Sequence, residues 1–186
     1  AEVMLDEGAT FIDVGAYSSK PNAEFVSELE ELERIVPVIN LLLKQFPEAI
    51  VSIDTFRSEV AKAAIEKGAA LINDISAGKL DERMMETIAH YKVPYVMMHM
   101  RGNPETMQSL THYNNIIKEM ILYFSEKVAK ARSLGINDLI LDPGFGFAKT
   151  IEQNYEVLQK FELFQMLELP ILAGVSRKSM IYKLLN

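Results

Sequence analysis

The sequence contains no cysteine and has fewer basic than acidic side chains. Without Cys, disulfides and thiolate metal sites are excluded, and a reducing compartment is compatible with the composition. Nineteen Lys and Arg against 26 Asp and Glu give a formal net charge of −7, which argues against nucleic acid or an anionic membrane as partner. No apolar run reaches the roughly 18 residues of a membrane span, and no charged-then-apolar leader opens the chain. We therefore expect a soluble, cytoplasmic protein.

What is present is a repeated pattern, in which a short run rich in Ile, Val and Leu precedes a longer amphipathic stretch. The runs are nearly continuously apolar, as strands buried on both faces are. They predict strands at Phe11–Gly15, Ile50–Thr55, Leu71–Ser76, Tyr95–His99, Leu139–Gly144 and Ile171–Ser176. The amphipathic stretches predict helices at Glu24–Phe46, Ser58–Lys67, Asp81–Tyr91, Tyr113–Leu134 and Ile151–Leu167, with another after Arg177. Gly8, Gly68 and Gly135 follow amphipathic runs, where helices end. Strict alternation predicts a parallel sheet with right-handed crossovers in one domain, residues 1–186.

Two architectures fit this alternation, a doubly wound open sheet and a closed (β/α)8 barrel of the TIM type. No strand is followed by the G-x-G-x-x-G fingerprint of a dinucleotide-binding sheet. Five predicted strands instead end in polar side chains, and the sixth closes with Gly174 and Ser176. The polar residues are Asp13, Asp54, Asn73 with Asp74, His99, and Asp142. In a barrel these positions surround the carboxyl-terminal mouth, where catalytic residues lie, so we predict the barrel.

A complete barrel has eight strands and about 250 residues, whereas about six βα units are visible here. The sequence opens in what resembles the end of a helix (Ala1–Glu7) and closes within another. We therefore expect a barrel domain that is incomplete at both ends, with the first and last strands outside this sequence.

The polar residues at the strand ends have a structural and a functional interpretation. A single Asp there often caps the next helix, an option open to Asp54 but restricted for Asp142, because Pro143 follows it directly. Several carboxylates, an amide and Lys178 at one mouth are harder to explain as separate caps. They suit a flat ligand rich in donors and acceptors, such as a pteridine, and a Mg²⁺ site is the rival interpretation.

Three other features have simpler explanations. We expect His90 to be a surface residue and the acidic run Glu28–Glu33 to be a solvated helix face. Met97, Met98 and Met100 are expected in the core, although Met98 could also line an apolar slot for an aromatic ring.

Six strings at the predicted strand ends match, in order, the motifs of one enzyme family. They are Ile12-Asp13-Val14-Gly15, Ser52-Ile53-Asp54-Thr55, Ile72-Asn73-Asp74-Ile75, Met98-His99-Met100-Arg101-Gly102, Leu141-Asp142-Pro143-Gly144-Phe145-Gly146-Phe147 and Gly174-Val175-Ser176-Arg177-Lys178-Ser179. On these strings the chain resembles the dihydropteroate synthase family of pterin-binding enzymes throughout its length. The family's fold is a (β/α)8 barrel, in agreement with the prediction above.

The resemblance implies an activity: joining 6-hydroxymethyl-7,8-dihydropterin diphosphate to 4-aminobenzoate, with release of pyrophosphate and use of Mg²⁺. It also implies a homodimer that is a target of sulfonamides. The pterin would contact Asp54, Asn73, Asp142 and Lys178, with Asp54 and Lys178 as the catalytic pair. Apolar walls would come from Ile75, Met98 and Phe147, and Gly174 would leave room for the ring. Aminobenzoate and diphosphate would be bound by Ser19, Lys20, Pro21, Ser176, Arg177 and Ser179.

Two departures from the family pattern stand out. Lys20 replaces the Arg of many members and lacks its planar fork for phosphate. The first-strand loop Asn-x-Thr-Pro-Asp-Ser-Phe and the last-strand Arg-x-His pair, which serve the diphosphate and metal in the family, do not occur in this sequence, so no metal ligand is assigned here. Two alternatives remain open: a methyltetrahydrofolate-dependent methyltransferase, which shares the barrel and the Asp/Asn set, and a non-catalytic pterin-binding remnant.

Overall fold

The computed structural model describes residues 1–19 and 23–185 and contains a five-stranded parallel sheet in the order β1-β2-β3-β4-β5. The strands are β1 (Phe11–Gly15), β2 (Ile50–Asp54), β3 (Leu71–Asp74), β4 (Tyr95–Met98) and β5 (Leu139–Asp142). Each agrees with a predicted strand to within two residues at either end.

Each strand in this sheet pairs with its neighbour in sequence, and the order never reverses. A doubly wound sheet would contain a switch point at which the strand order turns back. The ends of the strands are also aligned, since Gly15 pairs with Asp54, Asp54 with Asn73, and Met98 with Asp142. Sequential parallel order is the arrangement of a (β/α) barrel, and the aligned register brings the polar strand ends to one rim.

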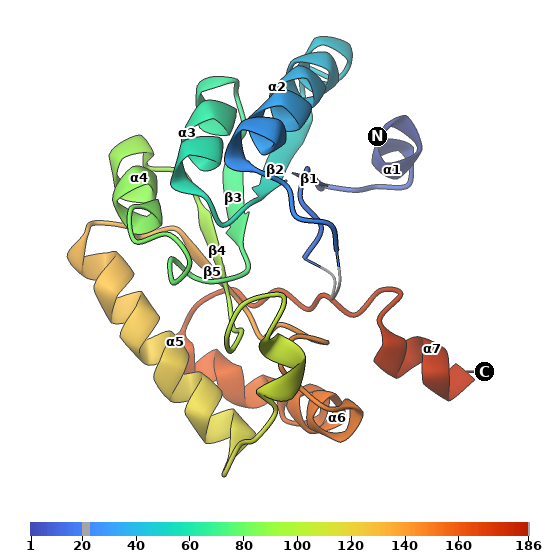
Figure 1. Ribbon diagram of the computed structural model, residues 1–186, viewed down its shortest axis with the longest axis vertical. Helices are drawn as coiled ribbons and strands as arrows, with labels where there is room; N and C mark the ends of the chain where they lie inside the picture. Colours follow the sequence, from blue (N-terminus) through green and yellow to red (C-terminus); the bar gives the residue numbers. More distant parts are fainter. Residues whose placement is uncertain (20–22, 186) are drawn as a thin grey trace.

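The helices form an arc around this sheet (Figure 1). They are α1 (Glu2–Asp6), α2 (Glu28–Gln45), α3 (Ser58–Glu66), α4 (Met84–Tyr91), α5 (Ile116–Ser133), α6 (Ile151–Gln159) and α7 (Ser179–Leu185), with 3₁₀ helices η1 (Met107–Ser109) and η2 (Phe161–Leu167). Helices α2 to α6 follow one another along the arc, while α1 and α7 lie on the side that the arc leaves open (Figure 1). None of the helices in the described part of the chain is long and apolar enough to cross a membrane.

Local sequence explains where several helices begin and end. The side chains of Ser27, Asn115 and Thr150 accept hydrogen bonds from backbone N–H groups in the first turns of α2, α5 and α6. Thr150 forms a full capping box with Gln153. The three glycines predicted to end helices all adopt positive φ. The predicted helix ends at these glycines are therefore confirmed. Glycine adopts a positive φ at little cost because it has no Cβ.

The helices predicted to begin at Glu24, Asp81 and Tyr113 begin three or four residues later, at Glu28, Met84 and Ile116, and two other predicted elements differ in kind. The predicted sixth strand, Ile171–Ser176, is reduced to one bridge between Ile171 and Leu141, with the Leu172 N–H donating to the Leu141 carbonyl at 2.8 Å. Among the described strands only β5 adjoins this segment, so it lacks a second partner that would extend the pairing. The predicted helix Ile151–Leu167 divides after Gln159 into α6 and the tighter η2, which brings Phe161 and Phe164 together with ring centroids 6.2 Å apart.

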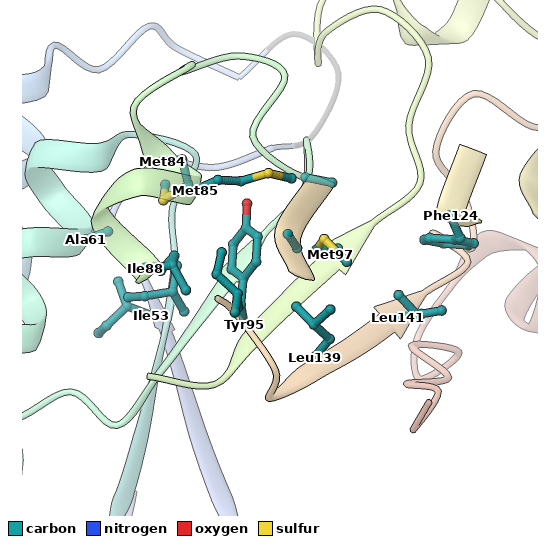
Figure 2. Close-up of a cluster of buried hydrophobic side chains, with 14 of the residues drawn as sticks. Ile53, Ala61, Met84, Met85, Ile88, Tyr95, Met97, Phe124, Leu139 and Leu141 are labelled. Atoms are coloured by element: carbon teal, nitrogen blue, oxygen red, sulfur yellow. The ribbon is translucent and has the colours of Figure 1, made fainter. Parts of the chain in front are cut away.

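The main core lies between the outer face of the sheet and the helices that cover it. Figure 2 shows Tyr95, Met97, Leu139 and Leu141 of the sheet packed toward Met84, Met85 and Ile88 of α4 and Phe124 of α5. The expected places of Met97, Met98 and Met100 in buried clusters are confirmed, and His90 is exposed as predicted.

One expectation about charge is wrong. Glu31, in the acidic run assigned to a solvated face, is 1% exposed. Its carboxylate accepts hydrogen bonds from the Arg57 guanidinium and, at 2.8 Å, from the Thr55 hydroxyl. Arg57 also donates to the Val26 carbonyl at 2.7 Å. Helix α2 packs beside α3, which turns one glutamate of the run inward, and buried carboxylates require such partners.

Candidate functional site

The inner face of the sheet carries a cavity of about 130 Å³ lined by residues of all five strands. Side chains alternate along a strand, so residues two apart share this face. The lining residues are Phe11, Asp13, Ser52, Leu71, Asn73, Val96, Ile140 and Leu172. Most of this lining is apolar, and Asp13, Ser52 and Asn73 are its polar members.

Asp54 ends β2, the strand between those that carry Asp13 and Asn73. The Asn73 amide donates to the Asp13 carboxylate at 3.1 Å. Gly15 is the β-sheet partner of Asp54, and a Cβ at Gly15 would lie 3.2 Å from that of Asp54. Burial raises the pKa of Asp54 to about 7, with Asp13, Asp74, Glu31 and Asp142 adding repulsion. At neutral pH both forms of the Asp54 carboxyl are therefore populated.

Asp142 ends β5 on the same face. Its Oδ1 accepts the Gly144 N–H at 2.7 Å, and no described residue donates a hydrogen bond to Oδ2. A Cβ placed on Gly174 would approach this Oδ2 to 4.0 Å, so glycine leaves the space beside the carboxylate open. Burial raises the pKa of Asp142, while the Gly144 N–H and the cations Lys178 and Lys149 oppose the rise.

Lys178 approaches the carboxylates from the segment before α7. Its Nζ lies 4.7 Å from the centre of the Phe147 ring. Burial lowers its pKa, and attraction to Asp142 and Asp54 opposes that shift. The structure thus brings together Asp54, Asn73, Asp142 and Lys178, which we call the polar ring.

An apolar cluster, separate from the main core, adjoins the polar ring. Its buried members are Ile75, Met98, Met100, Met107 and Ala148, with Phe56 and Phe147 packed against them. Three of these residues, Ile75, Met98 and Phe147, were expected as the walls of a pterin pocket. The site thus combines an apolar cluster with two carboxylates, an amide and an ammonium, a set suited to a flat heterocycle with many donors and acceptors.

The sequence profile of the family described as pterin binding enzyme matches residues 1–186. The chain belongs to this family. It is 45% identical to the dihydropteroate synthase of Synechocystis over 188 residues, which cover all of this chain and 65% of that protein. The crystal structure of Yersinia pestis dihydropteroate synthase with a sulfonamide drug complex matches with a TM-score of 0.94 and 40% identity, over all of this chain and 67% of that one.

A third comparison is the Xanthomonas albilineans dihydropteroate synthase with 4-aminobenzoic acid, at a TM-score of 0.91 and 36% identity, covering 99% of this chain and 65% of that one. The chain therefore spans about two thirds of these relatives, a little less in two of the three. The likeness to dihydropteroate synthases confirms the predicted TIM-type (β/α) barrel over this part of the fold.

Two of the polar strand-end residues, Asp74 and His99, are buried on the outer side of the sheet, whereas Asp13 lies beside the polar ring and is hydrogen-bonded to Asn73. Asp74 is fully buried on the outer side, where it accepts hydrogen bonds from the N–H groups of Ser76 and Gly78, both at 2.7 Å, and from the Tyr95 hydroxyl at 2.6 Å. It stabilises the turn after β3, so here the structural interpretation is correct. His99 is also buried on the outer side of the sheet. Its ring lies edge-on to that of Tyr123, with 4.9 Å between the ring centroids.

The residues expected to bind aminobenzoate and diphosphate lie on two separate segments of the chain. Ser176, Arg177 and Ser179 are exposed on the segment that carries Lys178, and Ser19 is half-buried in the segment after β1. Lys20 and Pro21 lie outside the described residues.

The described residues do not form a metal site. Within residues 1–19 and 23–185, no group of three or more His, Asp or Glu side chains is placed to hold a metal ion. Asp13, Asp54 and Asp142 belong to three different strands, β1, β2 and β5.

Two groups beside the site were missed in the sequence. Arg57 lies over the rings of Tyr17, Phe25 and Phe56, at 5.1, 5.9 and 5.3 Å from their centres, and joins the segment after β1 to the start of α3. Lys149 is 6% exposed behind the loop that follows β5. Neither residue has a sequence signal, because each acquires its partners from segments remote in the chain or from backbone carbonyls.

Proposed function

We propose that this chain is the pterin-binding part of a dihydropteroate synthase, within one barrel domain that includes residues 1–186. The reaction would join 6-hydroxymethyl-7,8-dihydropterin diphosphate to 4-aminobenzoate and release pyrophosphate. The observation that carries the proposal is the polar ring of Asp54, Asn73, Asp142 and Lys178 beside the apolar cluster that contains Ile75, Met98 and Phe147. Similarity to named dihydropteroate synthases supports it.

The polar ring would recognise the edges of a pterin. The Oδ2 of Asp142, which receives no hydrogen bond from a described residue, can accept from the two-donor, guanidine-like edge of the heterocycle. Asn73 can both donate and accept, and Lys178 can donate to a ring carbonyl or nitrogen. Phe147 and Met98 would contact the ring faces, and a side chain at Gly174 would occupy space next to Asp142.

Asp54 and Lys178 would also contribute to the chemical step. The bond from the pterin's exocyclic carbon to the diphosphate oxygen breaks, the aminobenzoate nitrogen bonds to that carbon, and the amine loses a proton. Positive charge on the pterin increases as the leaving group departs, and the ionised Asp54 would stabilise that charge. Lys178, held between Asp54 and Asp142 by charge, would fix the pterin's orientation.

The rest of the substrate would lie above the ring. We assign Ser19, Lys20, Pro21, Ser176, Arg177 and Ser179 to the aminobenzoate and diphosphate, with Lys20 and Arg177 as cations for the phosphates. Mg²⁺, when bound, would neutralise diphosphate charge, and its ligands would lie outside the described residues. We also propose a cytoplasmic homodimer that sulfonamides inhibit by occupying the aminobenzoate position.

Pyrophosphate release by the full-length protein tests this function. We expect release that requires both the pterin diphosphate and 4-aminobenzoate, and that falls at least tenfold in Asp142→Ala, which removes a charged hydrogen-bond acceptor. Pterin binding without pyrophosphate release would favour the non-catalytic remnant. Methyl transfer from methyltetrahydrofolate, with no use of 4-aminobenzoate, would favour the methyltransferase.

A further inference from the structure

Lys149 is a buried lysine that the proposed chemistry does not use. Its Nζ donates to the carbonyls of Gly144 at 2.9 Å and Phe147 at 3.1 Å, and lies 3.2 Å from Nδ1 of His99. The side chain therefore connects two points of the loop after β5 with the end of β4.

The hydrogen-bonding capacity of Lys149 is fully used within the protein. Burial lowers the pKa of Lys149 to about 7. In its protonated form the side chain has three N–H donors, and the structure offers three acceptors if His99 carries its proton on Nε2. Burial and the positive charge of Lys149 hold the pKa of His99 well below its usual range, which keeps that ring neutral and able to accept. In the protonated form of Lys149 no donor is left for a ligand, so its role is to hold the protein's own groups.

The loop held by Lys149 carries the pterin-facing groups. The Gly144 carbonyl is fixed by Lys149, and the N–H of the same residue is fixed by Oδ1 of Asp142 at 2.7 Å. Gly144 has φ +69°, and a Cβ there would lie 2.4 Å from the His99 carbonyl oxygen, so the loop lies directly against the end of β4. The second carbonyl belongs to Phe147, whose ring lies under Lys178.

We propose that Lys149 is a positioning residue of the pterin site, which orients the Asp142 carboxylate and the Phe147 ring by clamping the loop between them against His99. The inference rests on the proposed pterin-binding function. Its physical basis is preorganisation: a loop already held in its binding geometry loses less conformational freedom when the ligand arrives.

The test is calorimetric titration of the full-length protein with 6-hydroxymethylpterin, which lacks the diphosphate. Lys149→Met keeps the apolar stem and removes all three donors. Lys127→Met is the matched control, because Lys127 is a half-buried lysine on α5 that donates to the Ala77 carbonyl at 2.8 Å, away from the polar ring. We expect pterin binding to be at least about tenfold weaker in Lys149→Met and to change less than about twofold in Lys127→Met. The free energy of unfolding, measured with urea, should fall in both variants.

A double-mutant cycle separates positioning from general destabilisation. If Lys149 acts through the loop, Phe147→Leu costs less affinity in the Lys149→Met background than in the wild type, so the two losses are less than additive. Fully additive losses, or wild-type affinity in Lys149→Met, would overturn the inference.

A second pair of variants leaves Lys149 in place, so it remains informative if Lys149→Met does not fold. His99→Gln retains an acceptor for Lys149, whereas His99→Leu removes it. We expect pterin affinity to fall several-fold more in the leucine variant, and equal affinities in the two would overturn the inference. Absence of pterin binding by the wild-type protein would instead overturn the proposed function itself, together with the inference that depends on it.

Discussion

Asp54→Asn should stabilise the folded protein near neutral pH while it weakens pterin binding. The reason is the environment of the Asp54 carboxyl, whose pKa rises from an ordinary 3.8 to about 7 through burial first and then through repulsion from Asp13, Asp74, Glu31 and Asp142. Between these two pH values the unfolded chain has lost this proton and the folded chain has kept it. The folded state binds more protons there, so its stability falls as the pH rises from about 4 to about 7.

The size of the effect follows from the shift. A rise from 3.8 to about 7 is about 3 units, and at about 1.4 kcal/mol per unit the ionised Asp54 lowers the free energy of unfolding by up to about 4 kcal/mol. Asn cannot ionise, so it removes this penalty. It also removes the attraction between Asp54 and Lys178. We therefore expect a net gain of about 2 kcal/mol at about pH 7.5, decreasing to nothing at about pH 4.5.

Urea unfolding of the full-length wild type and Asp54→Asn at several pH values measures this gain. Asp81→Asn is the control, because the pKa of Asp81 is shifted in the opposite direction from that of Asp54. Burial alone would raise the pKa of Asp81, but hydrogen bonds from Ser58 and Arg83 lower it, so that variant should lose stability at neutral pH and lose less as the solution is acidified. A stability difference between wild type and Asp54→Asn that stays constant with pH would refute the reasoning, because a buried ionisation cannot produce it.

Three further outcomes are expected. Asp142→Ala should reduce pterin affinity about tenfold to a hundredfold, from about 1.5–3 kcal/mol for a charged hydrogen bond, and unchanged affinity by calorimetry would contradict its assignment. Gly144→Ala should lower the free energy of unfolding by more than about 1 kcal/mol, because its Cβ would lie 2.4 Å from the His99 carbonyl at a positive φ; a wild-type urea midpoint would argue against this close approach. Glu31→Ala should cost about 3–5 kcal/mol, because the Arg57 side chain, which is only 13% exposed, would lose its carboxylate partner; a change below about 1 kcal/mol would mean that the pair is effectively solvated.

The alternation of strands and helices could be predicted from the sequence, since each depends on local patterns. Apolar runs such as Leu139–Asp142 and the amphipathic period of Ile116–Ser133 are properties of neighbouring residues. The polar residues at the strand ends were equally visible, and their convergence at one rim followed from parallel pairing alone. The sixth strand was not predictable in the same way, because pairing depends on which neighbours are present.

The tertiary structure decided which of the polar residues face the site. Asn73 and Asp74 are adjacent and chemically similar in sequence, yet alternation along β3 places one in the polar ring and the other in a buried turn. Glu31 lies within an acidic run, and only the packing of α2 against α3 distinguishes it from the exposed glutamates beside it. Lys149 took its role from two backbone carbonyls and from His99, which is fifty positions away in the chain. Local sequence determines secondary structure through short-range periodicity, whereas burial and charge pairing depend on contacts between distant segments that no local pattern encodes.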